Sequence, residues 1–148
     1  MLDAATARNL AELQKILNDA QDAKRELFEV AQGRASSRAL GVALEASGVP
    51  RPPGYAAHHI AAGADERGEL ARGVLKKFNI GINDASNGVF LPANRATQVI
   101  AGETIHSTLH TKEYYDAVNE ALRGATTRQQ VIGILQNIRQ ALQSGDYP

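Results

Sequence analysis

The sequence predicts a mainly α-helical protein that contains one small β-hairpin. Of its 148 residues 43% are hydrophobic, but only 5% are aromatic and none is tryptophan, so aliphatic side chains and alanine must form most of the core. Such a composition is typical of helices packed on helices. Apolar residues also recur at helical spacing along much of the chain. Two short apolar segments, residues 56–60 and 87–91, are expected to pair as antiparallel strands.

The first fifty residues predict a helical hairpin packed on the rest of the chain. Apolar residues recur at helical spacing over residues 5–31, and a second helix is expected over 37–46. The glycine- and proline-rich segment 48–54 cannot continue that helix. We therefore expect an N-terminal hairpin over residues 1–50 and a core with a C-terminal helix over residues 51–148, together forming one compact unit.

Three further helices are expected in the second part of the chain, each with an apolar stripe. One begins after Asp65, which can cap it, and separates the two strands. Another begins after Thr111, which is a suitable cap, and follows the second strand. The last begins with Thr126 and Gln129, which match a capping box, and ends at Gly145.

Charge and cysteine content exclude several classes of function. Lys plus Arg and Asp plus Glu both number 16, so no overall positive field attracts nucleic acid, although a bound divalent cation would supply positive charge locally. Because cysteine is absent, disulfides and thiolate chemistry are excluded, and any metal must be held by His, Asp, Glu or Asn. No apolar run is long enough to cross a bilayer, so we expect no association with membranes.

All four histidines fall in two pairs at boundaries between the expected elements. His58 and His59 are neighbours in a strand, where adjacent side chains point to opposite faces, so one can face a metal and the other a substrate. His106 and His110 can reach a common ion if their segment is helical. With His58 they make three imidazoles, a set that suits Zn²⁺ with one position open. A catalytic metal site is favoured, and a non-catalytic, zinc-stabilised interaction module is the alternative.

Three blocks of sequence follow one another in order. They are Ala-His-His-Ile at 57–60, Gly-Ile-Asn-Asp at 81–84 with Asn-Gly-Val-Phe-Leu-Pro at 87–92, and His-Ser-Thr-Leu-His-Thr-Lys-Glu-Tyr-Tyr at 106–115. Together, over about residues 51–122, they resemble the AHH family of the HNH/endonuclease VII nuclease superfamily. The resemblance implies a ββα-metal core of the HNH kind.

The resemblance also implies a role for each matching residue. His58 would bind a divalent metal ion, with His106 and His110 as further ligands, and it stays open which of these two ligates. His59 would be the general base, and Asn87 would help to orient it. Zn²⁺ is the first choice of cofactor, with Mg²⁺, Mn²⁺ and Ni²⁺ as alternatives.

The function implied by the resemblance is that of a metal-dependent endonuclease that hydrolyses phosphodiester bonds of DNA, with RNA left open. Members of the family are typically toxin domains of bacterial polymorphic toxins, including type VI secretion effectors. We therefore expect a domain that is secreted from the producing bacterium and acts in the cytoplasm of a target cell. Its expected partners are a cognate immunity protein and a larger toxin or secretion apparatus. Candidates for phosphate contacts are Arg67, Arg72, Lys76, Lys77 and Arg95.

Overall fold

The computed structural model describes residues 3–31 and 33–148, which form helices around a two-stranded sheet. The α-helices are α1 (Ala4–Ala31), α2 (Ser37–Ala46), α3 (Glu69–Lys77), α4 (Lys112–Leu122) and α5 (Arg128–Ser144). The strands are β1 (Tyr55–His59) and β2 (Gly88–Pro92), and the short 3₁₀ helices are η1 (Glu66–Gly68), η2 (Ala85–Asn87), η3 (Arg95–Thr97) and η4 (His106–Thr108). The predicted fold class, mainly α with a small β-hairpin, is confirmed.

The sheet is an antiparallel pair in which Tyr55 lies opposite Pro92 and His59 opposite Gly88. Every residue of β2 is buried. Gly88 lies against α2, where an added Cβ would come within 2.6 Å of a methyl group of Leu40. The close contact between helix and strand therefore requires glycine at this position.

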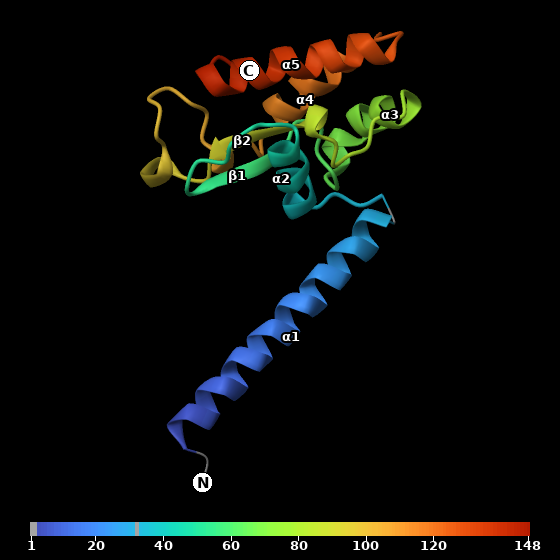
Figure 1. Ribbon diagram of the computed structural model, residues 1–148. Helices are drawn as coiled ribbons and strands as arrows, with labels where there is room; N and C mark the ends of the chain where they lie inside the picture. The colour runs from blue at the N-terminus through green and yellow to red at the C-terminus, as the bar shows by residue number, and fades with distance from the viewer. Residues whose placement is uncertain (1–2, 32) are drawn as a thin grey trace.

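The hairpin separates two apolar clusters, as alternation along β2 requires. Phe90 faces α2 and packs with Leu40 and Leu44, whereas Val89 and Leu91 face the larger cluster. That larger cluster is formed with residues of α3, α4 and α5. In Figure 1 the strands accordingly lie between α2 on one side and α4 and α5 on the other.

Helix caps explain where α4 and α5 begin. Thr111 accepts a hydrogen bond from the backbone N–H of Tyr114, as predicted. The cap of α5 is Thr127 instead of the predicted Thr126: its hydroxyl accepts from the N–H of Gln130, and the Gln130 side chain accepts from the N–H of Thr126. A capping box can be formed by Thr126 with Gln129 or by Thr127 with Gln130, and the structure uses the second pair.

The N-terminal helix α1 differs from the others because its described apolar side chains are exposed. Leu10, Leu13 and Leu17 are each about half exposed, at 49%, 56% and 57%. In Figure 1 α1 leads away from the body, whereas α2 packs on the sheet. The domain division predicted at residue 50 stays a prediction. No helix of the described residues is long and apolar enough to span a membrane.

Candidate active site

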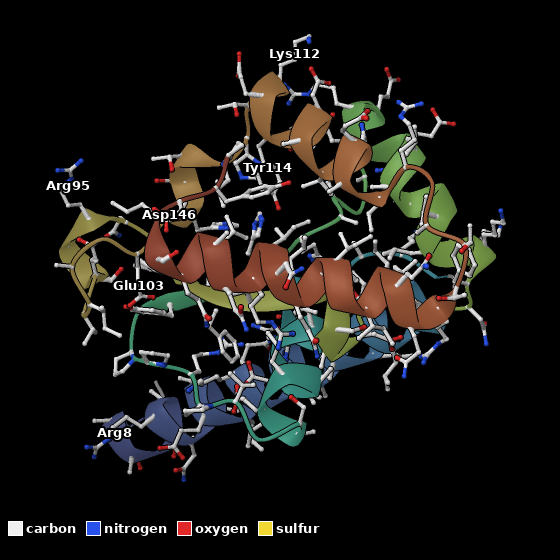
Figure 2. All side chains as sticks on the ribbon, turned by 90° about the horizontal axis from the view of Figure 1, so that it is seen from above. Arg8, Arg95, Glu103, Lys112, Tyr114 and Asp146 are labelled. Carbon is white, nitrogen blue, oxygen red and sulfur yellow. The ribbon has the colours of Figure 1, made fainter. Side chains whose placement is uncertain are left out.

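All four histidines line one cavity of about 270 Å³. His58 and His59 come from the end of β1, His106 from η4, and His110 from the turn before α4. The first turn of α4 closes one side through Tyr114: in Figure 2 this ring lies inside the molecule, whereas Lys112 points outward from the same helix. The fold therefore brings together the two histidine pairs that are far apart in the sequence.

His58 is buried and its hydrogen bonds assign its tautomer. The Tyr114 hydroxyl lies 2.8 Å from His58 Nε2 and donates its one proton to the carbonyl of Ile60, also at 2.8 Å. Because that proton is already used, His58 Nε2 must carry a proton and donate it to the hydroxyl oxygen. His58 Nδ1 is then unprotonated and accepts a hydrogen bond from His106 Nδ1, 3.1 Å away.

A divalent cation bound by both nitrogens would take the place of the proton between them, and their spacing suits such a cation. Two imidazole ligands of one tetrahedral Zn²⁺, each about 2.0–2.1 Å from the metal, are roughly 3.3 Å apart, close to the 3.1 Å seen between His58 and His106. Burial and the neighbouring His106 lower the pKa of His58 to about 3, and burial and His110 lower the pKa of His106. Both rings are therefore neutral at pH 7, which is the form that binds metals.

The expected third ligand, His110, does not join this pair. Its ring centroid is 5.5 Å from that of His106, and its Nδ1 lies 3.3 Å from the Tyr115 hydroxyl. The two histidines were expected to reach a common ion if they shared an α-helix. They do not share one, because His106 is in the 3₁₀ helix η4 and His110 precedes α4. Among residues 3–31 and 33–148 no group of three or more His, Cys, Asp or Glu side chains is placed to hold a metal ion. A ligand role for His110 stays a prediction.

His59 is half-buried and is oriented by Asn83. Its Nε2 lies 2.9 Å from Asn83 Oδ1, an atom that can only accept, so Nε2 carries the proton and Nδ1 is the basic nitrogen. Burial lowers the pKa of His59, although the bond to Asn83 acts in the opposite direction. A neutral imidazole with a fixed tautomer has the properties that a general base requires.

Asn87, the predicted orienting residue, makes different contacts. Its Oδ1 accepts from the N–H of Ala61 at 2.8 Å, and its Nδ2 donates to the carbonyls of Ala61 and Ile82. It is completely buried, and its side chain bonds the backbone of Ala61 and Ile82, whereas His59 Nε2 bonds Asn83. Asn87 thus ties the segment that follows β1 to the turn that precedes β2, and it can affect the base only through the backbone.

Asn83 and Tyr114 are the site residues that the sequence did not single out. Asn83 belongs to a segment, residues 83–88, that is dense in turn-forming residues, and its spacing from His59 carries no signal that separates it from Asn87. Tyr114 belongs both to the core and to the site, because it is 1% exposed and bonded to His58.

Asp65 lines the cavity, and its carboxylate and two neighbouring arginines are held by hydrogen bonds. The Asp65 carboxylate accepts two hydrogen bonds from the Arg67 guanidinium, at 3.0 and 2.9 Å, and these hold the pKa of Asp65 at about 2. Arg67 also lies over the Tyr115 ring, 4.4 Å from its centroid. Arg72 donates to the carbonyls of Ala62 and Asp65. Two of the candidate phosphate-binding cations therefore stabilise the loop that forms the wall.

A comparison with protein families identifies the class of protein as a nuclease of the HNH/endonuclease VII superfamily. The chain belongs to the AHH family, described as a nuclease family of the HNH/ENDO VII superfamily with conserved AHH, whose family model matches residues 42–144. The three letters correspond to Ala57, His58 and His59. The protein is thus a nuclease, and nucleic acid is its partner. Searches of curated proteins and of solved structures gave no match.

Proposed function

We propose that this nuclease is a metal-dependent endonuclease that hydrolyses phosphodiester bonds of DNA. The observation that carries the proposal is the arrangement in one cavity of a pair of imidazole nitrogens, His58 Nδ1 and His106 Nδ1, 3.1 Å apart, beside an oriented base, His59. The pair is suited to a cation and His59 to proton transfer. The remaining coordination positions would belong to water and to substrate oxygens.

The residues divide the chemistry between them. A divalent cation held by His58 and His106 would neutralise charge on a phosphate oxygen. His59 Nδ1 takes a proton from the attacking water as its oxygen bonds to phosphorus and the bond from phosphorus to the leaving oxygen breaks. The leaving oxygen keeps the electron pair of that bond and takes a proton from water. Asn83 Oδ1 continues to accept the Nε2 proton, which stabilises the imidazolium. Tyr114 keeps His58 Nδ1 directed into the cavity.

The cation and the biological role form part of the proposal. Zn²⁺ is our first choice because both protein ligands are imidazoles, and Mg²⁺, Mn²⁺ and Ni²⁺ are the alternatives to be compared. The family resemblance favours an antibacterial toxin domain that is delivered by a secretion apparatus or larger toxin, acts in the cytoplasm of the target cell, and is neutralised by an immunity protein.

Plasmid cleavage with and without a chelator tests the proposal. The intact protein should nick plasmid DNA, lose this activity with the chelator and regain it when metal is added. His59→Ala should lower the rate at least about 100-fold while calorimetric titration still detects metal binding. His58→Ala should weaken metal binding itself.

The control is Leu17→Ala on α1, a helix that leads away from the rest of the protein in Figure 1 and does not line the cavity, and this variant should cleave as the parent does. Metal binding without cleavage of either DNA or RNA by the folded parent would instead favour the non-catalytic, zinc-stabilised interaction module.

The toxin role has a separate test in cells. Expression of the domain in a bacterial cytoplasm should arrest growth and degrade the chromosome, whereas His59→Ala should be tolerated at the same protein level. A folded, metal-loaded parent that leaves growth and chromosome intact would contradict this role.

A further inference from the structure

We propose that the connector between α1 and α2, residues 34–36, positions the general base by fixing the side-chain amide of Asn83. The inference rests on the proposed function of His59. The connector lies outside residues 42–144, the segment that matches the family. The nuclease site would therefore include a positioning element that the family match does not cover.

The first step is the orientation of the amide. Asn83 Nδ2 donates to the carbonyl of Arg34 at 2.8 Å, and Asn83 Oδ1 accepts from the N–H of Ser36 at 2.8 Å. If the amide were turned over, its NH₂ group would face the Ser36 N–H and its oxygen would face the Arg34 carbonyl. Both contacts would be repulsive, so the connector allows one orientation.

The second step passes from the amide to the imidazole. With Oδ1 fixed, the group that faces His59 Nε2 at 2.9 Å is an acceptor. His59 must then carry its proton on Nε2 and leave Nδ1 unprotonated. The backbone of Arg34 and Ser36 thereby selects which nitrogen of His59 can accept a proton from water.

The connector is also closely fitted to the wall of the cavity. Ala35 packs on Gly63, a residue that lines the cavity, so closely that a Cβ added to Gly63 would lie 1.9 Å from the Ala35 Cβ. Ser36 is buried and caps α2 by accepting from the N–H of Ala39 at 3.1 Å. A larger side chain at position 35 must therefore move the connector away from the loop that contains Gly63.

Substitutions at Ala35 in the full chain test the inference. Ala35→Leu should displace the connector, and Ala35→Gly is the matched control that adds no bulk. Nitrogen-15 NMR of the metal-free protein should show His59 protonated on Nε2 in the parent and in Ala35→Gly, and a mixture of tautomers in Ala35→Leu. Cleavage by Ala35→Leu should fall about tenfold, with metal affinity unchanged. Retention of the parent tautomer and rate by this variant would overturn the inference.

Asn83→Asp provides the test of mechanism, because a carboxylate accepts the Nε2 proton whichever way it is turned. Since it cannot donate to the Arg34 carbonyl, the rate of this single variant is the reference for the double variant. In that background Ala35→Leu should cause no further loss of rate. An equal loss with and without Asn83→Asp would mean that the connector acts by another route.

Should Ala35→Leu not fold, an ester in place of the Ser36 amide removes only the N–H that binds Asn83, and the same outcomes apply. A parent with the Nε2 tautomer and no cleavage would contradict the proposed function alone, and a cleaving parent protonated on Nδ1 would contradict this inference alone.

Discussion

Helices α1 and α5 are predicted by the same periodicity and have opposite surroundings. The apolar stripe of α5 is buried, with Leu135 and Leu142 completely inaccessible, whereas Leu13 and Leu17 of α1 are more than half exposed. Spacing of 3.6 residues predicts a helix and the side on which its apolar residues lie, but it does not state what covers that side. The difference can be measured as stability, since only covered side chains contribute packing energy.

The largest expected difference is between two leucine truncations. Leu135→Ala should lower the free energy of unfolding by about 3 kcal/mol, because it leaves a cavity in the core, whereas Leu17→Ala should change it by less than ~0.5 kcal/mol. Urea denaturation of both variants measures the two values. A comparable loss in both variants would mean that α1 packs against the other helices in solution, and the difference drawn between α1 and α5 would be wrong.

Two asparagines give a smaller difference of the same kind. Asn87→Ala should lower the free energy of unfolding by about 2 kcal/mol, because buried backbone groups of Ala61 and Ile82 lose their partner. The exposed Asn18 side chain accepts a hydrogen bond from the Gln14 side chain, and alanine is the better helix former, so Asn18→Ala should be neutral or slightly stabilising. The same denaturation experiment applies, and a neutral Asn87→Ala would contradict the role assigned to that residue.

Lowering the pH should reduce the free energy of unfolding of the part of the protein that packs around the sheet, and should leave helix α1 unchanged. The pKa of His58 is about 3 in the folded, metal-free protein and ~6.5 when unfolded, so the unfolded chain binds more protons and the stability contribution falls as the pH drops below 6.5. Between pH 7.5 and 5.5 this loss amounts to about 1.4 kcal/mol, and burial of His59 adds to it.

Urea denaturation at several pH values, in the presence of a chelator, measures the slope of the free energy of unfolding against pH. His58→Asn, which can still bond the Tyr114 hydroxyl, should reduce the slope without abolishing it. A slope that this substitution leaves unchanged would show that other groups are responsible.

Much of the fold could be predicted because its signals are local. The strand segments, the cap at Thr111 and the end of α5 at Gly145 follow from residues that are close in sequence. The sequence does not decide which threonine caps α5, because Thr126 and Thr127 are each followed three residues later by a glutamine. The surroundings of α1 could not be predicted either, since coverage depends on distant residues.

The site was predictable in its histidines and not in the residues that orient them. His58, His59, His106 and His110 line one cavity, while the roles that the resemblance implies for them stay predictions. Their hydrogen-bond partners depend on how remote segments meet. Asn83 bonds both His59 and the connector, and no spacing in the sequence specifies these contacts. Asn87 had the expected position and made backbone contacts instead.

The pairing of β1 with β2 has a consequence for the order in which the protein folds. The strands are separated in the sequence by η1, α3 and η2, so the pair is a non-local contact that forms only after a long loop has closed. His58 and His59 are carried by the strand that must wait for this closure, and His106 arrives from a still later segment. During refolding, far-UV ellipticity should therefore recover before the histidine cluster exists, and a chain with only its helices formed has no assembled centre.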